Sequence, residues 1–124
     1  RDIGVTGVQT CASSDLLAQL PAHALNLVGK LSLTEYLSLI SQCDGLLAAG
    51  TGPLHLAASI GVNALGLFPP TRPIHPGRWE PIGKKASYLC IDRACATCAT
   101  NNTTCECMQL LTPQMVFDKI AQWN

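Results

Sequence analysis

The chain is poor in charge and in aromatic residues. Only 13% of its 124 residues are charged, against a usual share of about 25%, and eight basic side chains balance eight acidic ones. A net charge of zero argues against a nucleic-acid module, because such modules carry a basic excess that neutralises phosphates. Aromatic residues make up 5%, yet 48% of the chain is hydrophobic, which argues against disorder.

Long apolar runs are missing as well. No run approaches the roughly 20 residues that a membrane-spanning helix needs. The sequence opens with Arg1-Asp2 and has no charged-then-apolar leader, so it predicts no signal peptide. It has no initiator methionine, and we therefore expect a piece of a longer protein. The length predicts one domain, residues 1–124, with a core of its own.

Cysteine, by contrast, is abundant, with seven in the chain. Cys11 and Cys43 stand alone in apolar or helical surroundings and are predicted to be buried small side chains. The other five crowd into a cysteine-rich loop at residues 90–107, where a C-x-x-C pair precedes a C-x-C pair: Cys95, Cys98, Cys105 and Cys107. Four thiols from two short loops can form a tetrahedral structural zinc site. A reduced or partly disulfide-linked loop and plain packing thiols are the alternatives.

Apolar and amphipathic stretches alternate along the sequence. The pattern predicts strands at residues 3–8, 26–28, 45–49, 63–68 and 87–91, and helices at about 13–20, from 32, at 53–60 and at about 113–123. Ser32 and Glu35 have the spacing of a capping box at the second helix, whose apolar stripe would contain Leu33, Leu37 and Ile40. Alternation of this kind indicates βαβ units and a mainly parallel sheet.

One turn of this pattern suits an anionic ligand. An apolar strand runs into Gly50-Thr51-Gly52, and Pro53 then opens a helix that contains His55. Unpaired amides and the positive end of the helix dipole would face the carboxyl edge of the sheet, where α/β folds bind ligands. Thr51 is expected to cap the helix and to donate to a phosphate oxygen. A purely structural turn is the alternative, and the Walker pattern is absent.

Three segments together resemble the heptosyltransferase family (glycosyltransferase family nine). They are Gly29-Lys30-Leu31-Ser32-Leu33, Gly50-Thr51-Gly52-Pro53-Leu54-His55-Leu56-Ala57-Ala58, and Leu67-Phe68-Pro69-Pro70-Thr71-Arg72-Pro73. In that family a "G-x-x-S-L" turn, a "D-[ST]-G-x-x-H-x-A-A" motif and an "F-G-P-T" turn occur in this order and at about these distances. The segment from Cys107-Met108 to Val116 also looks like the end of many family members.

The resemblance implies a GT-B fold, two Rossmann-like domains facing across a cleft. This chain would be most of the C-terminal, donor-binding domain: an α/β, Rossmann-like parallel sheet with flanking helices that lacks its first strand-helix unit. The family likeness implies that Thr51, Gly52 and the amides after Pro53 hold the donor diphosphate. It places the turn Lys30, Leu31 and Ser32 against the adenine, and His55, Thr71 and Arg72 beside the donor sugar and pyrophosphate.

Two positions depart from the family pattern. Gly50 stands where the family has an acid, and Pro69 stands where it has a turn glycine. Without the acid, one polar contact to the donor is lost. The family's catalytic base belongs to the N-terminal domain, so this chain is expected to contain no catalytic residue. The chemistry needs no cofactor beyond the donor, ADP-heptose or a similar nucleotide sugar.

The resemblance therefore implies the donor-binding part of an inverting glycosyltransferase of lipopolysaccharide core biosynthesis, inactive by itself. Its partners would be the nucleotide-sugar donor and, through the other half, a lipopolysaccharide-core acceptor. The location would be cytoplasmic or peripheral, at the inner face of the inner membrane. Because a missing central strand exposes backbone edges, we expect a homo-oligomer or a rearranged sheet. The alternative function is a non-catalytic α/β interaction domain with a structural cysteine–metal loop.

Overall fold

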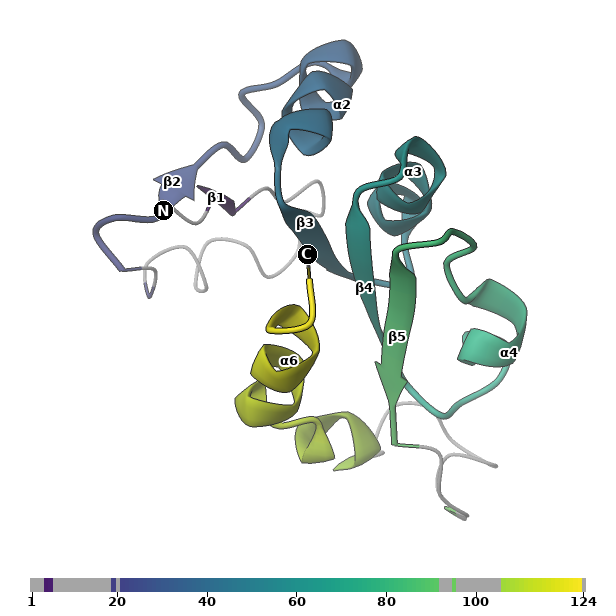
Figure 1. Ribbon diagram of the computed structural model, residues 1–124. Coiled ribbons are helices and arrows are strands. Elements are labelled where there is room, and N and C mark those ends of the chain that lie inside the picture. The colour runs from purple at the N-terminus through teal and green to yellow at the C-terminus, as the bar shows by residue number, and fades with distance from the viewer. Residues whose placement is uncertain (1–3, 6–18, 20, 92–94, 96–105, 124) are drawn as a thin grey trace. The chain divides into compact units, whose positions relative to one another are not determined.

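The computed structural model in Figure 1 describes residues 4–5, 19, 21–91, 95 and 106–123. The chain divides into two compact units, Arg1–Ser38 and Leu39–Asn124. The helix predicted at about 13–20 lies outside the described residues except for Gln19.

The first unit contains a short parallel strand pair. Strand β1 spans Gly4–Val5 and pairs in parallel with β2, Leu25–Asn26. Strand β2 begins one residue before the predicted strand at 26–28 and ends at Asn26. The side chain of Asn26 accepts a hydrogen bond from the amide of Val28, at 3.0 Å. This local bond satisfies the amide of Val28 just after β2 ends, as asparagine side chains do in turns.

Helix α2, Leu33–Gln42, begins with the predicted capping box. A carboxylate oxygen of Glu35 accepts hydrogen bonds from the amide (2.8 Å) and hydroxyl (2.7 Å) of Ser32, and the Glu35 amide donates to that hydroxyl at 3.4 Å. These bonds stabilise the ionised carboxylate and lower the pKa of Glu35 from its ordinary value of 4.5. The predicted apolar stripe is wrong at Leu33, which is 67% exposed, whereas Ile40 is buried.

The second unit is built on a three-stranded parallel sheet. Its strands, β3 (Gly45–Ala49), β4 (Asn63–Phe68) and β5 (Ala86–Cys90), lie in the order β3-β4-β5. The predicted bounds of the first two are confirmed, and β5 begins one residue earlier than predicted. Leu47 pairs with Leu65 and Leu65 with Ser87, so the three strands are in register.

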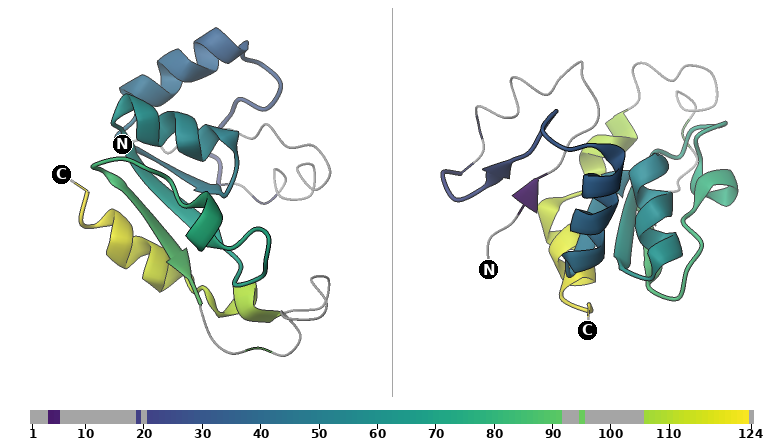
Figure 2. Two further views of the ribbon diagram at one scale, coloured as in Figure 1. Left: turned by 90° about the vertical axis from the view of Figure 1, so that its right-hand side faces the viewer. Right: turned by 90° about the horizontal axis from the view of Figure 1, so that it is seen from above.

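Helices cover both faces of this sheet. Helix α3 (Gly52–Ile60) lies on one face and α6 (Pro113–Ile120) on the other, as Figure 2 shows. Helix α3 ends where predicted, because Gly61 adopts the left-handed conformation with φ +83°. The largest fully buried side chains are Phe68, Ile40, Leu54, Leu65, Pro76 and Cys107.

Two short helices occupy segments for which the sequence pattern predicted no helix. Helix α4 spans Pro76–Trp79, and a 3₁₀-helix, η1, spans Glu106–Leu110. Side-chain bonds hold α4 in place: the imidazole of His75 accepts from the Gly77 amide at 3.0 Å, and the Trp79 indole donates to the Pro73 carbonyl at 2.9 Å. Helices this short carry no apolar periodicity, so the sequence pattern could not reveal them.

Strand β3 forms an edge of its sheet, since in the described part of the chain it pairs with β4 alone. Leu47, at the centre of β3, is 45% exposed. None of the described helices has both the length and the apolar character of a membrane span. Cys43 is exposed, so the prediction that it is buried is wrong, and Cys11 lies outside the described residues.

Candidate functional site

The candidate site lies at the carboxyl edge of the β3-β4-β5 sheet. Carboxyl ends of adjacent parallel strands meet at one edge, so the segments that follow β3 and β4 leave the sheet side by side. The first carries Gly50, Thr51 and Gly52, all exposed, and leads into α3. The second carries Thr71 and Arg72. The fold thus brings two of the three predicted site segments to the same edge.

Thr51 ties the Gly50–Gly52 turn to the end of β3, the strand that precedes it. Its amide donates to the Ala49 carbonyl at 2.7 Å, and its hydroxyl donates to the same oxygen at 3.2 Å. Thr51 occupies the N-cap position of α3, but its side chain makes no capping hydrogen bond. The predicted side-chain cap is therefore wrong: the Thr51 oxygen accepts no amide of α3, and its hydroxyl is turned toward the strand carbonyl instead.

Few amides remain for an anion at the start of α3. Pro53 has no N–H, and the amide of Leu54 already donates to the Thr51 carbonyl at 3.1 Å. The Gly52 amide is the first-turn donor that has no protein partner among the described residues. A Cβ built at Gly52 would meet no atom within 4 Å, so this side of the turn is open. Among the described residues, the start of α3 thus offers the Gly52 amide together with the positive end of the helix dipole.

The ring of Phe68 explains why position 50 is glycine. A Cβ built at Gly50 would overlap that ring, and one at Gly66 would come within 2.5 Å of it. Phe68 is 1% exposed and makes an edge-on contact with Tyr88, with ring centroids 6.1 Å apart. No room is left for the acid that the family pattern places here. Sequence reasoning missed the role of Phe68, although a glycine just after one predicted strand, Gly50, and a glycine within the next, Gly66, were a signal.

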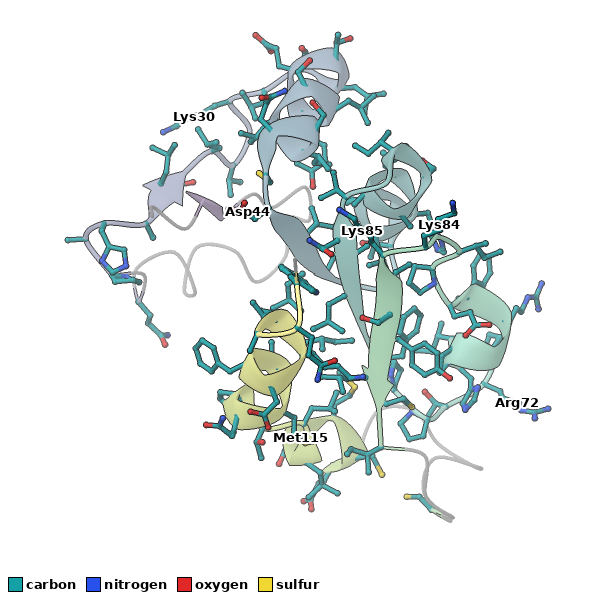
Figure 3. All side chains as sticks on the ribbon, viewed as in Figure 1. Lys30, Asp44, Arg72, Lys84, Lys85 and Met115 are labelled. Atoms are coloured by element: carbon teal, nitrogen blue, oxygen red, sulfur yellow. The ribbon has the colours of Figure 1, made fainter. Side chains whose placement is uncertain are left out.

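The second segment supplies the positive charge. Arg72 is exposed, and its side chain extends outward from the chain after β4 (Figure 3). Thr71 is 3% exposed, so its side chain packs inside the protein rather than facing solvent. His55, in the first turn of α3, is half-buried. Arg72 is thus an exposed cation in the turn that directly follows β4.

The predicted adenine turn belongs to the first unit, whereas the turns described above belong to the second. Lys30 is exposed and its amide donates to the Leu27 carbonyl at 3.2 Å. Leu31 is half-buried, and the hydroxyl of Ser32 is engaged with Glu35 in the capping box. The side chain of Ser32 therefore has a structural role at the start of α2, and the adenine contact stays a prediction.

The predicted thiolate site falls partly outside the described residues. Cys107 lies on η1 and is 1% exposed, and Cys95 is half-buried. Cys98 and Cys105 lie outside the described residues. Among the residues that the structure describes, no three histidine, cysteine or acidic side chains gather as metal ligands would. Zinc binding by the cysteine-rich loop stays a prediction.

Comparison with known proteins places the chain in a family. The model of glycosyltransferase family 9 (heptosyltransferase) matches residues 9–109. Lipooligosaccharide heptosyltransferase 2 of Campylobacter jejuni is 28% identical over 99 residues, 76% of this chain and 30% of the relative. The protein of the same name from Haemophilus influenzae is 30% identical over 71 residues, 57% of this chain and 20% of the relative.

The fold agrees with this assignment. The structure of Escherichia coli ADP-heptose lps heptosyltransferase II superposes with a TM-score of 0.72 and 22% sequence identity, over 97% of this chain and 35% of that one. The chain thus spans about a third or less of the length of these relatives. The parallel sheet and its flanking helices match the heptosyltransferase fold, and the family model covers most of the sequence. The chain belongs to glycosyltransferase family 9, the heptosyltransferase family.

Proposed function

We propose that this chain is the donor-binding part of an inverting glycosyltransferase and that it binds the diphosphate of a nucleotide sugar. One observation carries the proposal: the exposed turn Gly50–Gly52 presents the Gly52 amide and the start of α3 at the carboxyl edge of a parallel sheet. Arg72 leaves the same edge after the neighbouring strand. The similarity to lipooligosaccharide heptosyltransferases and to Escherichia coli ADP-heptose lps heptosyltransferase II suggests ADP-heptose as the donor and a lipopolysaccharide-core sugar as the acceptor.

The proposed reaction is a displacement at the anomeric carbon of the donor. An acceptor hydroxyl attacks that carbon in line, the bond to the diphosphate breaks with its electron pair, and the nucleoside diphosphate leaves. Negative charge then grows on the departing phosphate oxygen. In this chain, the Gly52 amide, the α3 dipole and the Arg72 guanidinium would stabilise that charge.

General-base help and acceptor binding are assigned to the part of the relatives that this chain does not span. The 124-residue chain is therefore expected to bind the donor without transferring its sugar. Full-length protein would act in the cytoplasm or at the inner face of the inner membrane, where such an acceptor is built.

Binding of ADP to the chain, measured by isothermal titration calorimetry, tests the proposal. Thr51→Trp places a bulky ring over the turn and is expected to weaken binding by about tenfold or more, since loss of one hydrogen bond to a charged group costs about 1.5–3 kcal/mol and about 1.4 kcal/mol is tenfold in affinity. Ser59→Trp is the matched control, because Ser59 is an exposed hydroxyl residue near the other end of α3. Equal ADP affinity in both variants would count against the proposal, as would failure of the unchanged chain to bind ADP.

The alternative, an interaction domain built around a metal-binding cysteine loop, makes a different prediction. Elemental analysis of the purified chain would then show about one zinc per chain, as a four-thiolate structural site requires, and ADP would leave the melting temperature unchanged. No described residue favours this alternative over nucleotide binding.

A further inference from the structure

We propose that Phe68 is a positioning residue that holds the Gly50–Gly52 turn in the geometry that binds the diphosphate. Gly50 and Phe68 then act as one unit. This inference rests on the proposed function, since it concerns the same turn. The pairing of β3 with β4 is the first observation that supports it.

The register places Gly50 beside Phe68. Ala48 pairs with Gly66 and Ala49 with Leu67, so the next step along both strands brings Gly50 opposite Phe68. In parallel strands, side chains at paired positions point to the same face. Gly66 shares that face, because Phe68 follows it by two residues. The Phe68 ring therefore lies on the α3 side of the sheet, where a Cβ at Gly66 would also meet Leu54 of α3 at 2.7 Å.

The absence of side chains at these two glycines gives the ring its space. Cβ atoms at Gly50 and at Gly66 would both press on the ring, while Tyr88 holds it from β5 with planes at 80°. Phe68 is therefore confined on several sides and almost wholly buried, at 1% exposure. Because protein interiors are close-packed, a ring held in this way cannot shift without moving its neighbours.

The turn rests on this ring on one side and is tied to its own strand on the other. Two hydrogen bonds from Thr51 to the Ala49 carbonyl fix the turn to β3. The backbone of Gly50 lies directly against the Phe68 ring. Two residues after Gly50, the Gly52 amide is the first-turn amide of α3 that has no partner among the described residues. The direction of this N–H is therefore set by a ring that does not itself touch a ligand.

A smaller side chain at position 68 removes this support. We expect Phe68→Leu to keep the fold and to weaken ADP binding by about tenfold, because a displaced Gly52 N–H makes a longer and less well aligned hydrogen bond to the charged phosphate. Leu65→Ala is the matched control: Leu65 is equally buried in β4, but it lies an odd number of residues from Phe68 and so on the other face. The Leu65→Ala variant should lose stability and keep its affinity for ADP. The ADP affinity of both variants is measured by calorimetry, under conditions where urea titration shows that both are folded.

A double variant tests the coupling between the two residues. Gly50→Ala should weaken ADP binding in the unchanged background, and Gly50→Ala/Phe68→Leu should recover part of the loss, because the shorter side chain makes room for the methyl group. If Gly50→Ala does not fold, the ADP affinities of Phe68→Leu and Leu65→Ala are sufficient to test the positioning role of Phe68.

The outcomes separate this inference from the proposed function. Wild-type ADP affinity in folded Phe68→Leu, or an equal loss of affinity in Leu65→Ala, overturns the positioning role and leaves the proposed function standing. Failure of the unchanged chain to bind ADP overturns both. A loss confined to Phe68→Leu, with recovery in the double variant, supports both.

Discussion

The indole ring of Trp123 lies on the backbone of Gly45, so closely that a Cβ at this glycine would overlap the ring. Gly45 opens β3, and Trp123 follows α6 near the end of the sequence. The contact fastens α6 and its flanking residues to one face of the sheet. The Trp123 ring can lie this close to the strand only because residue 45 has no side chain.

Gly45→Ala is expected to destabilise the protein by about 1–3 kcal/mol, as overpacking of a well-filled contact does. Urea unfolding followed by circular dichroism measures the change. Gly52→Ala is the control, since a Cβ there meets nothing within 4 Å, and its effect should stay within about 0.5–1 kcal/mol. Equal stability of the two variants would show that the ring can move aside.

The end of α3 gives a second prediction. Gly61 has φ +83°, a conformation that costs a residue with a Cβ about 1–2 kcal/mol. Gly61→Ala should lower the free energy of unfolding by about that amount, and Gly61→Asn should cost less, because asparagine tolerates the left-handed region. No side chain crowds this position, since a Cβ there meets nothing within 4 Å. A larger loss for asparagine than for alanine would contradict the conformational explanation.

The capping box of α2 predicts a pH dependence. Folding lowers the pKa of Glu35 through its hydrogen bonds with Ser32, so the folded state binds this proton less tightly than the unfolded state. The stabilisation is therefore present above the ordinary pKa of the carboxyl and is lost as the pH falls through the lowered value. A carboxyl titration followed by NMR should show the shift, and Ser32→Ala should raise the pKa of Glu35. An unchanged pKa in Ser32→Ala would refute this origin of the shift.

The edge of β3 predicts self-association. Among the residues that the structure describes, β3 pairs on one side only, and an apolar strand with an open backbone edge is a template for another strand. We expect the 124-residue chain to sediment as dimers or larger species, and Leu47→Lys to shift it toward monomer, because charge on an edge strand opposes pairing. Ile82→Lys is the control, since Ile82 is 86% exposed and lies outside the three strands. Sedimentation of the unchanged chain as a monomer at high concentration would refute this expectation.

Much of the second unit follows from local sequence signals. The apolar run Gly45–Ala49, the proline after Gly52 and the glycine at position 61 mark strand and helix ends that the structure confirms. The capping box at Ser32 was equally local, because its partners are three residues apart. Such signals are readable because the interacting groups are neighbours in the sequence.

The features that the sequence did not reveal depend on distant or competing contacts. Phe68 and Gly50 are eighteen positions apart and meet only through the strand register. The Thr51 hydroxyl can accept from a helix amide or turn its O–H toward a strand carbonyl, and the local pattern did not show that it does only the second. Cys43 is apolar by type but exposed, which depends on the packing around the end of α2.

The order of the strands in space equals their order in the chain. During synthesis, β3 and α3 leave the ribosome before β4, and β5 follows with its neighbour already in place. Each addition extends an existing sheet by one strand and does not require insertion between two others. Trp123 follows these strands in the chain and covers one face of the sheet over Gly45. Growth of this unit can therefore be vectorial, from the amino-terminal strand outward.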